Sequence, residues 1–184
     1  MNKFTLTTMA SILVMTSAGS LAYADSDNTA VVHFTGKVTA PTCEFTSPNQ
    51  TVQLDAVQSS DLDKVAMGSA ISTGQKNFSL NLACEAKAEA GHIAITVDGT
   101  ADSSQPAVLA NSSGSESGTG LELFSEQDQN TPLALNKELP QNDYLDRLNE
   151  GDDNIGFIVK YARDRKDVTG GDVSADATFV VSYK

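Results

Sequence analysis

The sequence contains few of the side chains from which catalytic and metal sites are built. Its 184 residues include no tryptophan, two histidines and two cysteines. Common zinc, redox and serine-nucleophile motifs (His-x-x-x-His, Cys-x-x-Cys and Gly-x-Ser-x-Gly) do not occur. His33 falls on the polar face of an expected strand and His92 at the start of another, as ordinary surface histidines do. We therefore expect a protein that is not an enzyme and that holds no cofactor or metal.

Basic side chains are also scarce. The 12 Lys and Arg residues stand against 24 Asp and Glu, for a formal net charge of −12. Nucleic acids and anionic membrane surfaces are bound through clustered cations, so neither is an expected partner. The acidic segment 143–153 lacks the ligand spacing of a calcium loop, and we interpret it as a solvated loop. The excess of acid then favours solubility.

No apolar run is long enough to cross a bilayer as a helix. The mostly apolar stretch Phe4–Val14 follows a positively charged start and precedes the small-residue pattern Ala22–Ala24. This order is typical of a secretory signal peptide, with Ala22 and Ala24 at the cleavage site. Residues 25–184 suit a single exported domain, which would bury roughly 70% of its unfolded surface.

The two cysteines, Cys43 and Cys84, are an even number in a chain that we expect to be exported, which favours a disulfide. The bridge would close a loop of about 41 residues, for which the chain-entropy model gives roughly 4 kcal/mol. Two buried free thiols are the alternative, and an oxidising compartment makes it the weaker one.

Alternation of apolar and polar residues, the mark of a strand with one buried face, recurs along the chain. It is most regular at the C-terminus, where one face carries Ala175, Ala177, Phe179, Val181 and Tyr183. Other expected strands are 30–39, 43–45, 52–54, 77–84, 92–98, 121–123 and 155–162. Residues 136–154 are turn-rich, and a helical turn is favoured only at Ser60–Leu62. About seven or eight short strands without a long helix predict an all-β sandwich, here without the buried tryptophan of antibody-type domains.

The order of extension, cysteine pair and terminal strand resembles that of type 1 fimbrial subunits. The matching segments are Val32–Val38 (VHFTGKV), Ala40–Cys43 (APTC), Val52–Leu54 (VQL), Phe78–Cys84 (FSLNLAC) and Ala175–Lys184 with its penultimate Tyr183. Gly171 stands where that family also tends to carry glycine. The resemblance covers essentially all of residues 25–184.

The resemblance implies an incomplete immunoglobulin-like β-sandwich that is completed by a donor strand from another subunit. Residues 1–24 would be the signal peptide, residues 25–38 the donor extension and residues 39–184 the pilin domain. The donor strand would present Ala30, Val32, Phe34, Gly36 and Val38. The accepting C-terminal strand, which a chaperone would also engage, would use Gly171, Phe179, Val181 and Tyr183.

The same resemblance implies a structural role. The chain would be the major shaft subunit of a chaperone–usher fimbria and would polymerise by donor-strand exchange to support cell adhesion. Its partners would be other copies of itself, a periplasmic chaperone and an outer-membrane usher. It would pass through the periplasm to the cell surface.

Two alternatives remain open at this point. Residues 30–38 could be the first strand of a closed, self-sufficient sandwich that binds carbohydrate, or the chain could be a minor fimbrial adaptor.

The segments 144–153 and 160–166 are more charged than the small-residue loops usual in the family. We expect both of them on the surface of the fibre.

Overall fold

The computed structural model describes residues 33–37, 42–85, 92–115, 117–150 and 153–184. The chain separates into two units, Met1–Val38 and Thr39–Lys184, and the helices and strands of the described residues lie in the second. Within the described part of the chain, no helix is long and apolar enough to cross a membrane.

Several predicted features fall outside the described residues. They are the signal cleavage residues Ala22 and Ala24 and the donor positions Ala30, Val32 and Val38. The boundaries of the signal peptide, the donor extension and the pilin domain stay predictions. Of the expected strand 30–39, residues 33–37 are described, and they are exposed and form no strand in the single chain.

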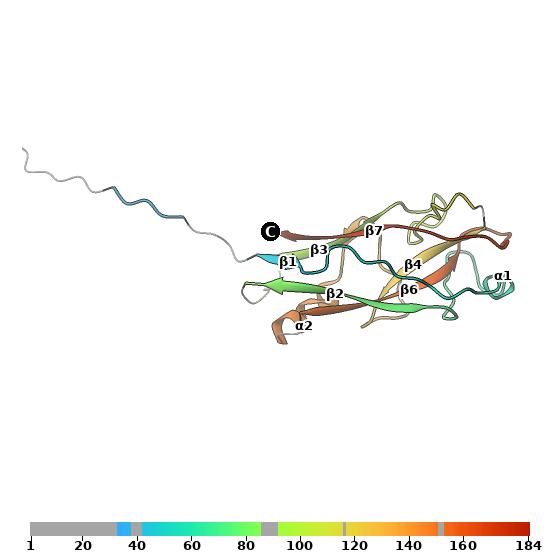
Figure 1. Ribbon diagram of the computed structural model, residues 1–184, viewed down its shortest axis with the longest axis horizontal. Coiled ribbons are helices and arrows are strands. Elements are labelled where there is room, and N and C mark those ends of the chain that lie inside the picture. The colour runs from blue at the N-terminus through green and yellow to red at the C-terminus, as the bar shows by residue number, and fades with distance from the viewer. Residues whose placement is uncertain (1–32, 38–41, 86–91, 116, 151–152) are drawn as a thin grey trace, which may run out of the picture. The chain divides into compact units, whose positions relative to one another are not determined.

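The second unit consists of two antiparallel sheets (Figure 1). The four-stranded sheet has the order β1 (Cys43–Phe45), β2 (Lys76–Cys84), β6 (Asn154–Arg163) and β4 (Thr119–Ser125). The three-stranded sheet has the order β5 (Lys137–Glu138), β3 (Ile93–Gly99) and β7 (Ala177–Tyr183). The predicted strands 43–45, 77–84, 92–98, 121–123, 155–162 and 175–184 are therefore confirmed, with small shifts at their ends.

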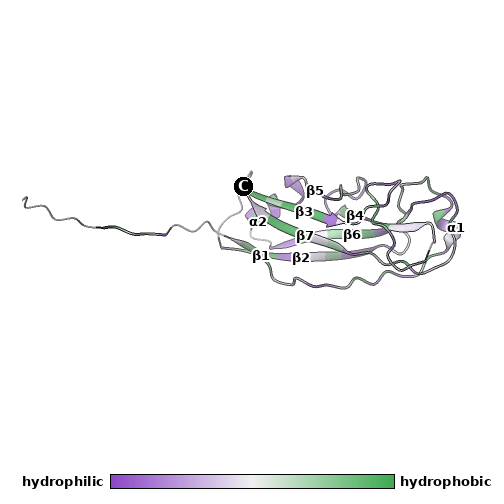
Figure 2. Ribbon diagram, turned by 90° about the horizontal axis from the view of Figure 1, so that it is seen from above, coloured by the Kyte–Doolittle hydropathy of each residue, from purple (hydrophilic) through white to green (hydrophobic). Residues whose placement is uncertain are grey.

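The core lies between the inner faces of the two sheets, where the apolar members of each alternating strand meet. Hydrophobic residues, green in Figure 2, recur along β3 and β6. Leu82 of β2 and Phe157 of β6 are almost fully buried on one side, as are Ile95 and Val97 of β3 on the other. Phe78 and Phe157 are cross-strand neighbours in the β2–β6 ladder. The period of two therefore converts directly into two facing apolar layers.

The prediction that segment 144–153 is exposed on the surface is wrong for its apolar residues. The chain forms a 3₁₀ turn, η1 (Gln141–Asp143), and then a short helix, α2 (Leu145–Glu150), where the sequence predicted only turns. Tyr144 is fully buried and its hydroxyl donates to the carbonyl of Ile93 at 3.1 Å. Leu145 and Leu148 join the core cluster, because a helix of this length still places residues three apart on one face. The expected single turn near Ser60 is present as α1 (Ser59–Leu62).

The expectation that segment 160–166 is exposed is also wrong in part. Lys160 is only 7% exposed and its ammonium donates to the carbonyl of Gln129 at 2.9 Å. The same ammonium lies 4.0 Å from the centre of the Phe124 ring. Its cross-strand neighbour Glu122 is 2% exposed, and burial raises the pKa of that carboxyl to about 7, although Lys160 opposes the shift. A charged pair on the outer face of β4 and β6 is thus covered by the surrounding chain.

The raised pKa of Glu122 predicts a pH dependence of stability. The folded chain holds this proton more tightly than the unfolded chain, so the free energy of unfolding falls as the pH rises from 4.5 to about 7. Glu122→Gln cannot ionise, and it should raise the free energy of unfolding by ~1–2 kcal/mol at pH 8 and change it little at pH 4. Urea unfolding at the two pH values measures the difference. The exposed Glu150→Gln is the control, and an equal effect of Glu122→Gln at both pH values would contradict the assignment.

Candidate functional site: an open groove along the last strand

One side of the sandwich is closed by a connecting segment. Leu109 bridges to Ala101, which follows β3, and to Leu121 of β4. The amides of Leu109 and Leu121 donate to each other's carbonyls at 2.7 and 3.1 Å. A Cβ at the neighbouring Gly120 would overlap the Leu109 backbone, so the close approach requires glycine there. On this side the two sheets are joined by main-chain hydrogen bonds.

The opposite side of the sandwich is open. β7 is the terminal strand of its sheet and pairs with β3 alone among the described strands. No strand pairing within the described chain links β7 to β1 or β2, which border the same side. A long strand with one unpaired edge exposes a row of amides and carbonyls to any other extended chain.

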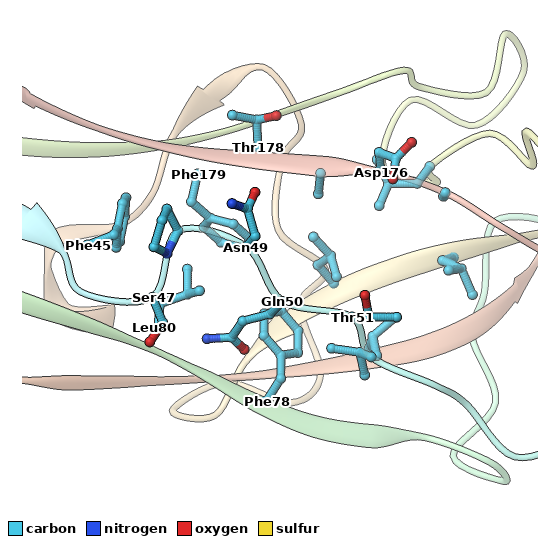
Figure 3. A pocket seen from close by; sticks show the side chains of 18 of the residues that line it. Phe45, Ser47, Asn49, Gln50, Thr51, Phe78, Leu80, Asp176, Thr178 and Phe179 are labelled. Atoms are coloured by element: carbon cyan, nitrogen blue, oxygen red, sulfur yellow. The ribbon is translucent and has the colours of Figure 1, made fainter.

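Two adjoining clefts lie along this open side, and together they form what we call the open groove. The first has a volume of about 770 Å³ and an apolar floor that includes Leu80, Leu121, Leu123 and Val159. In Figure 3, Phe179 from β7 and Phe78 from β2 point into it from opposite walls. The second cleft, of about 790 Å³, continues past Tyr161 to Gly171–Asp176. Because both clefts are bordered by Val52, Leu54 and Ala175, they are continuous.

Two phenylalanines that line the groove, Phe78 and Phe179, pack against a third, Phe157, which is buried in the core. The ring centroids of Phe157 and Phe179 are 4.8 Å apart, and those of Phe78 and Phe157 are 5.5 Å apart. The Phe78 and Phe179 rings meet edge to face at 6.1 Å. The cluster links the two sheets at the open side, and such ring pairs add about 0.5–1.5 kcal/mol each to the burial of their area.

The predicted strand at Val52 and Leu54 is wrong. Residues 47–57 form no strand, and none of them makes a backbone–backbone hydrogen bond with another described residue. Pairing with β2 ends where the amide of Thr46 donates to Asn81, and beyond it the side chain of Gln50 donates to the carbonyl of Ser79 at 2.9 Å. Val52 and Leu54 are half-buried while Thr51 and Gln53 are exposed, so the alternation does identify the side of the segment that faces the core. The ladder is missing because no neighbouring strand is present on the groove side.

Tyr183 is the last residue of β7, and its side chain contacts β1. Its hydroxyl donates to the carbonyl of Cys43 at 3.0 Å and so joins β7 to β1. Partial burial raises the pKa of Tyr183, and the charges of Glu44 and Glu85 raise it further. The side chain is still 42% exposed, so it lies at the rim of the sandwich, whereas the alternation had placed it on the inner face.

Two of the three other predicted accepting residues border the groove. Phe179 lines the first cleft, and Gly171 lines the second. Val181 packs against the core cluster and is not among the residues that border the groove. A Cβ at Gly171 would overlap the side chain of Ser115, so glycine allows the two segments to approach.

The donor positions that are described lie in the first unit. Phe34 is 91% exposed, and a Cβ added at Gly36 would have no neighbour within 4 Å. An aromatic side chain this exposed is unusual in a single soluble chain, and a row of such residues marks an interaction segment. The assignment of the donor strand stays a prediction.

The predicted disulfide is present. Cys43 of β1 and Cys84 of β2 are bonded and are directly opposite in the ladder between these strands. Within the described residues, no group of three or more His, Cys, Asp and Glu side chains is arranged to hold a metal ion.

Sequence reasoning missed the residues that hold the far end of the groove. Asn111 stands in a Ser- and Gly-rich stretch of the sequence, and its side-chain amide binds the backbone of Asp172 and Ser174. The available signal was weak. Asn among Ser and Gly predicts side-chain bonds to nearby backbone, and it says nothing of a partner 63 positions away.

Comparison with known proteins gives a consistent result. A model of the family described as "Fimbrial protein" matches residues 32–184. The type-1 fimbrial protein A chain of Escherichia coli K12 is 32% identical over 180 residues, which cover 95% of this chain and 94% of the relative. The fimbrial subunit type 1 of Salmonella typhimurium is 30% identical over 190 residues, which cover 100% and 99%.

Solved structures agree at the level of the fold. The P pilus rod subunit PapA superposes with a TM-score of 0.58 at 17% identity, over 85% of this chain and all of that one. A type I fimbria protein of Burkholderia pseudomallei gives 0.52 at 22% identity, over 78% of this chain and all of that one. The fold is an incomplete immunoglobulin-like β-sandwich, as predicted, and the chain belongs to the fimbrial protein family.

Proposed function

We propose that this chain is a structural subunit of a chaperone–usher fimbria and that it polymerises by donor-strand exchange. In each contact, residues 30–38 of one copy enter the open groove of the next copy beside β7. The observation that carries the proposal is the groove itself, a channel with an apolar floor between two backbone edges, residues 47–57 and β7, that have no partner strand on that side among the described residues.

The dimensions of the two segments support the pairing. Residues 30–38 and residues 173–181 are equal lengths of extended chain, roughly 30 Å each. Every second residue of the extension is apolar or glycine, so one face of a donor strand can enter the groove while the other faces water. Val32, Phe34 and Val38 would fill apolar pockets, and Gly36 would pass where the backbones approach most closely.

The energetic gain is large enough to hold subunits together. Burying three side chains of the size of Val and Phe contributes several kcal/mol at ~25 cal/mol per Å² of apolar area. Main-chain hydrogen bonds to the two edges add register and slow dissociation. Because an uncovered groove of this kind promotes aggregation, it must also be covered before assembly. A periplasmic chaperone that lends a strand, followed by transfer at an outer-membrane usher, satisfies this need for an exported subunit.

A carbohydrate-binding module fits the structure less well. Sugar sites are usually lined by exposed aromatic faces, whereas the three phenylalanines at the groove are packed against one another. Among the described large apolar residues, the exposed aromatics are Phe34 and Tyr183. One domain with a donor extension suits a shaft subunit, which repeats along the fibre, and an adaptor that occurs once is the alternative.

Deletion of residues 25–38 from the mature chain tests the proposal. The shortened subunit should still accept a synthetic peptide of residues 25–38 but should form no polymer with itself. Size-exclusion chromatography with light scattering distinguishes these states, and the intact mature chain is the control. Polymers formed by the shortened subunit would refute the role of the extension.

A further inference from the structure

The accepting edge extends on the N-terminal side of β7. Residues 172–176 precede β7 and border the second cleft. The ladder between β3 and β7 ends at the pair Gly99 and Ala177, so β3 does not hold this continuation. Another element must fix the direction in which its amides and carbonyls point.

The side chain of Asn111 provides that support. Its carbonyl oxygen accepts from the amide of Ser174 at 3.0 Å, and its amide nitrogen donates to the carbonyl of Asp172 at 2.9 Å. The same nitrogen donates to the carbonyl of Ser115 at 2.9 Å, which ties the side chain to its own loop. A primary amide has the donor and acceptor of a peptide group, so Asn111 takes the place of one residue of a neighbouring strand.

Neighbouring serines strengthen the same contact. The amide and hydroxyl of Ser112 donate to the carbonyl of Ser174 at 2.7 and 3.0 Å. The hydroxyl of Ser113 donates to the carbonyl of Asp172 at 2.6 Å. The even-numbered residues 172 and 174 therefore direct their backbone groups toward the Asn111 loop.

The amides and carbonyls of the odd-numbered residues point to the opposite side. In an extended chain, successive residues point their backbone groups to opposite sides. Val173 and Ala175 thus present their amides and carbonyls toward the groove, and neither makes a backbone hydrogen bond with a described residue. The even phase continues to the C-terminus, where the amide of Lys184 donates to His92 at 3.0 Å, so Phe179 and Val181 face the same free edge.

We propose that Asn111 is a positioning residue that lengthens the accepting edge of the groove by holding Val173 and Ala175 in register with β7. The inference rests on the proposed donor-strand exchange. Asn111 touches no part of the incoming strand. It acts through Asp172 and Ser174. Their fixed backbone keeps the amides and carbonyls of Val173 and Ala175 directed toward the donor strand.

Amide hydrogen exchange tests this directly. The full mature chain, with its own extension disabled by Phe34→Asp, is mixed with a peptide of residues 25–38. With Asn111 present, the peptide should protect the amides of Val173, Ala175, Phe179 and Val181. In Asn111→Ala, protection of Val173 and Ala175 should fall at least about tenfold, as expected for lost hydrogen bonds, while Phe179 and Val181 stay protected.

A matched variant separates positioning from a general loss of stability. Asn136 forms a similar two-way amide bridge, with bonds of 3.2 and 3.1 Å, to Gly99, the residue of β3 that pairs with Ala177. The bridge lies at the same end of the β3–β7 ladder but makes no hydrogen bond to residues 172–176 among the described residues. Its φ of 58° suits glycine, so Asn136→Gly removes the bridge without backbone strain. This variant should leave the protection of Val173 and Ala175 unchanged.

The outcomes distinguish the two proposals. If the peptide protects none of the four amides while Asn111 is present, donor-strand exchange itself fails. If it protects Phe179 and Val181 only, or if all four stay protected in Asn111→Ala, the role of Asn111 is refuted. Should Asn111→Ala not fold, Asn111→Asp is measured instead, since it keeps the acceptor for Ser174 and loses the donor to Asp172. Full protection of both amides in that variant would equally overturn the inference.

Discussion

Phe34→Asp should abolish polymerisation while leaving the fold of the subunit intact. Phe34 belongs to the first unit, where its side chain is 91% exposed, so its replacement removes no packing within that unit. In the proposed fibre the same side chain enters an apolar groove, where an unpaired carboxylate costs several kcal/mol. The expected loss of affinity between subunits is more than about a thousandfold. Light scattering of the purified mature chain measures it, and Phe34→Leu, which keeps an apolar side chain of similar reach, should retain most assembly.

Mixing the Phe34→Asp chain with the unaltered chain tests whether the variant has lost only the ability to donate a strand. A Phe34→Asp chain still carries an intact groove, so it can accept a strand that it cannot donate. Added to the unaltered chain, it should bind at one end of each polymer and shorten the average length in proportion to its share of the mixture. Polymers of unchanged length, or a variant that polymerises alone, would contradict the assignment of Phe34 as a donor residue.

Removal of the disulfide should have the largest effect on stability. Cys43→Ala combined with Cys84→Ala is expected to lower the free energy of unfolding by about 2–5 kcal/mol. The bond joins the first residue of β1 to the last residue of β2, and the carbonyl of Cys43 is the acceptor for Tyr183. Urea unfolding of the variant, compared with the unaltered chain under oxidising and reducing conditions, measures the change.

The same experiment has an internal check. The reduced unaltered chain and the double variant should unfold at similar urea concentrations, because both lack the covalent link. If the variant matched the oxidised chain instead, the disulfide would contribute nothing to the folded state, and the link between β1 and β2 would rest on packing alone.

The regular strands could be predicted from the sequence because each has one buried face. Phe78, Leu80 and Leu82 alternate with Ser79 and Asn81, and the structure places these apolar residues toward the core. The pattern at Val52 and Leu54 is equally good, yet no strand forms there. A strand requires a hydrogen-bonded neighbour as well as an apolar face, and alternation reports only on the face.

Other parts of the site could not be predicted, for different physical reasons. Lys160 and Glu122 look like surface residues in sequence, and they are buried because loops far along the chain cover them. Tyr144 and Leu148 lie in an acidic segment whose charges hide a short apolar helical face. Asn111 binds residues more than sixty positions away, and no local pattern reports such a contact.

The bridge through Leu109 closes one side of the sandwich and so limits the number of subunits that each molecule can bind. In the proposed assembly each copy has one extension and, among the described residues, one open groove, so it can accept one donor strand and donate one. Such head-to-tail contacts repeat the same rotation and translation at every step, which yields an unbranched filament whose two ends differ. Branching would need a second receptive edge, and the backbone bonds between Leu109 and Leu121 occupy the place where it could form.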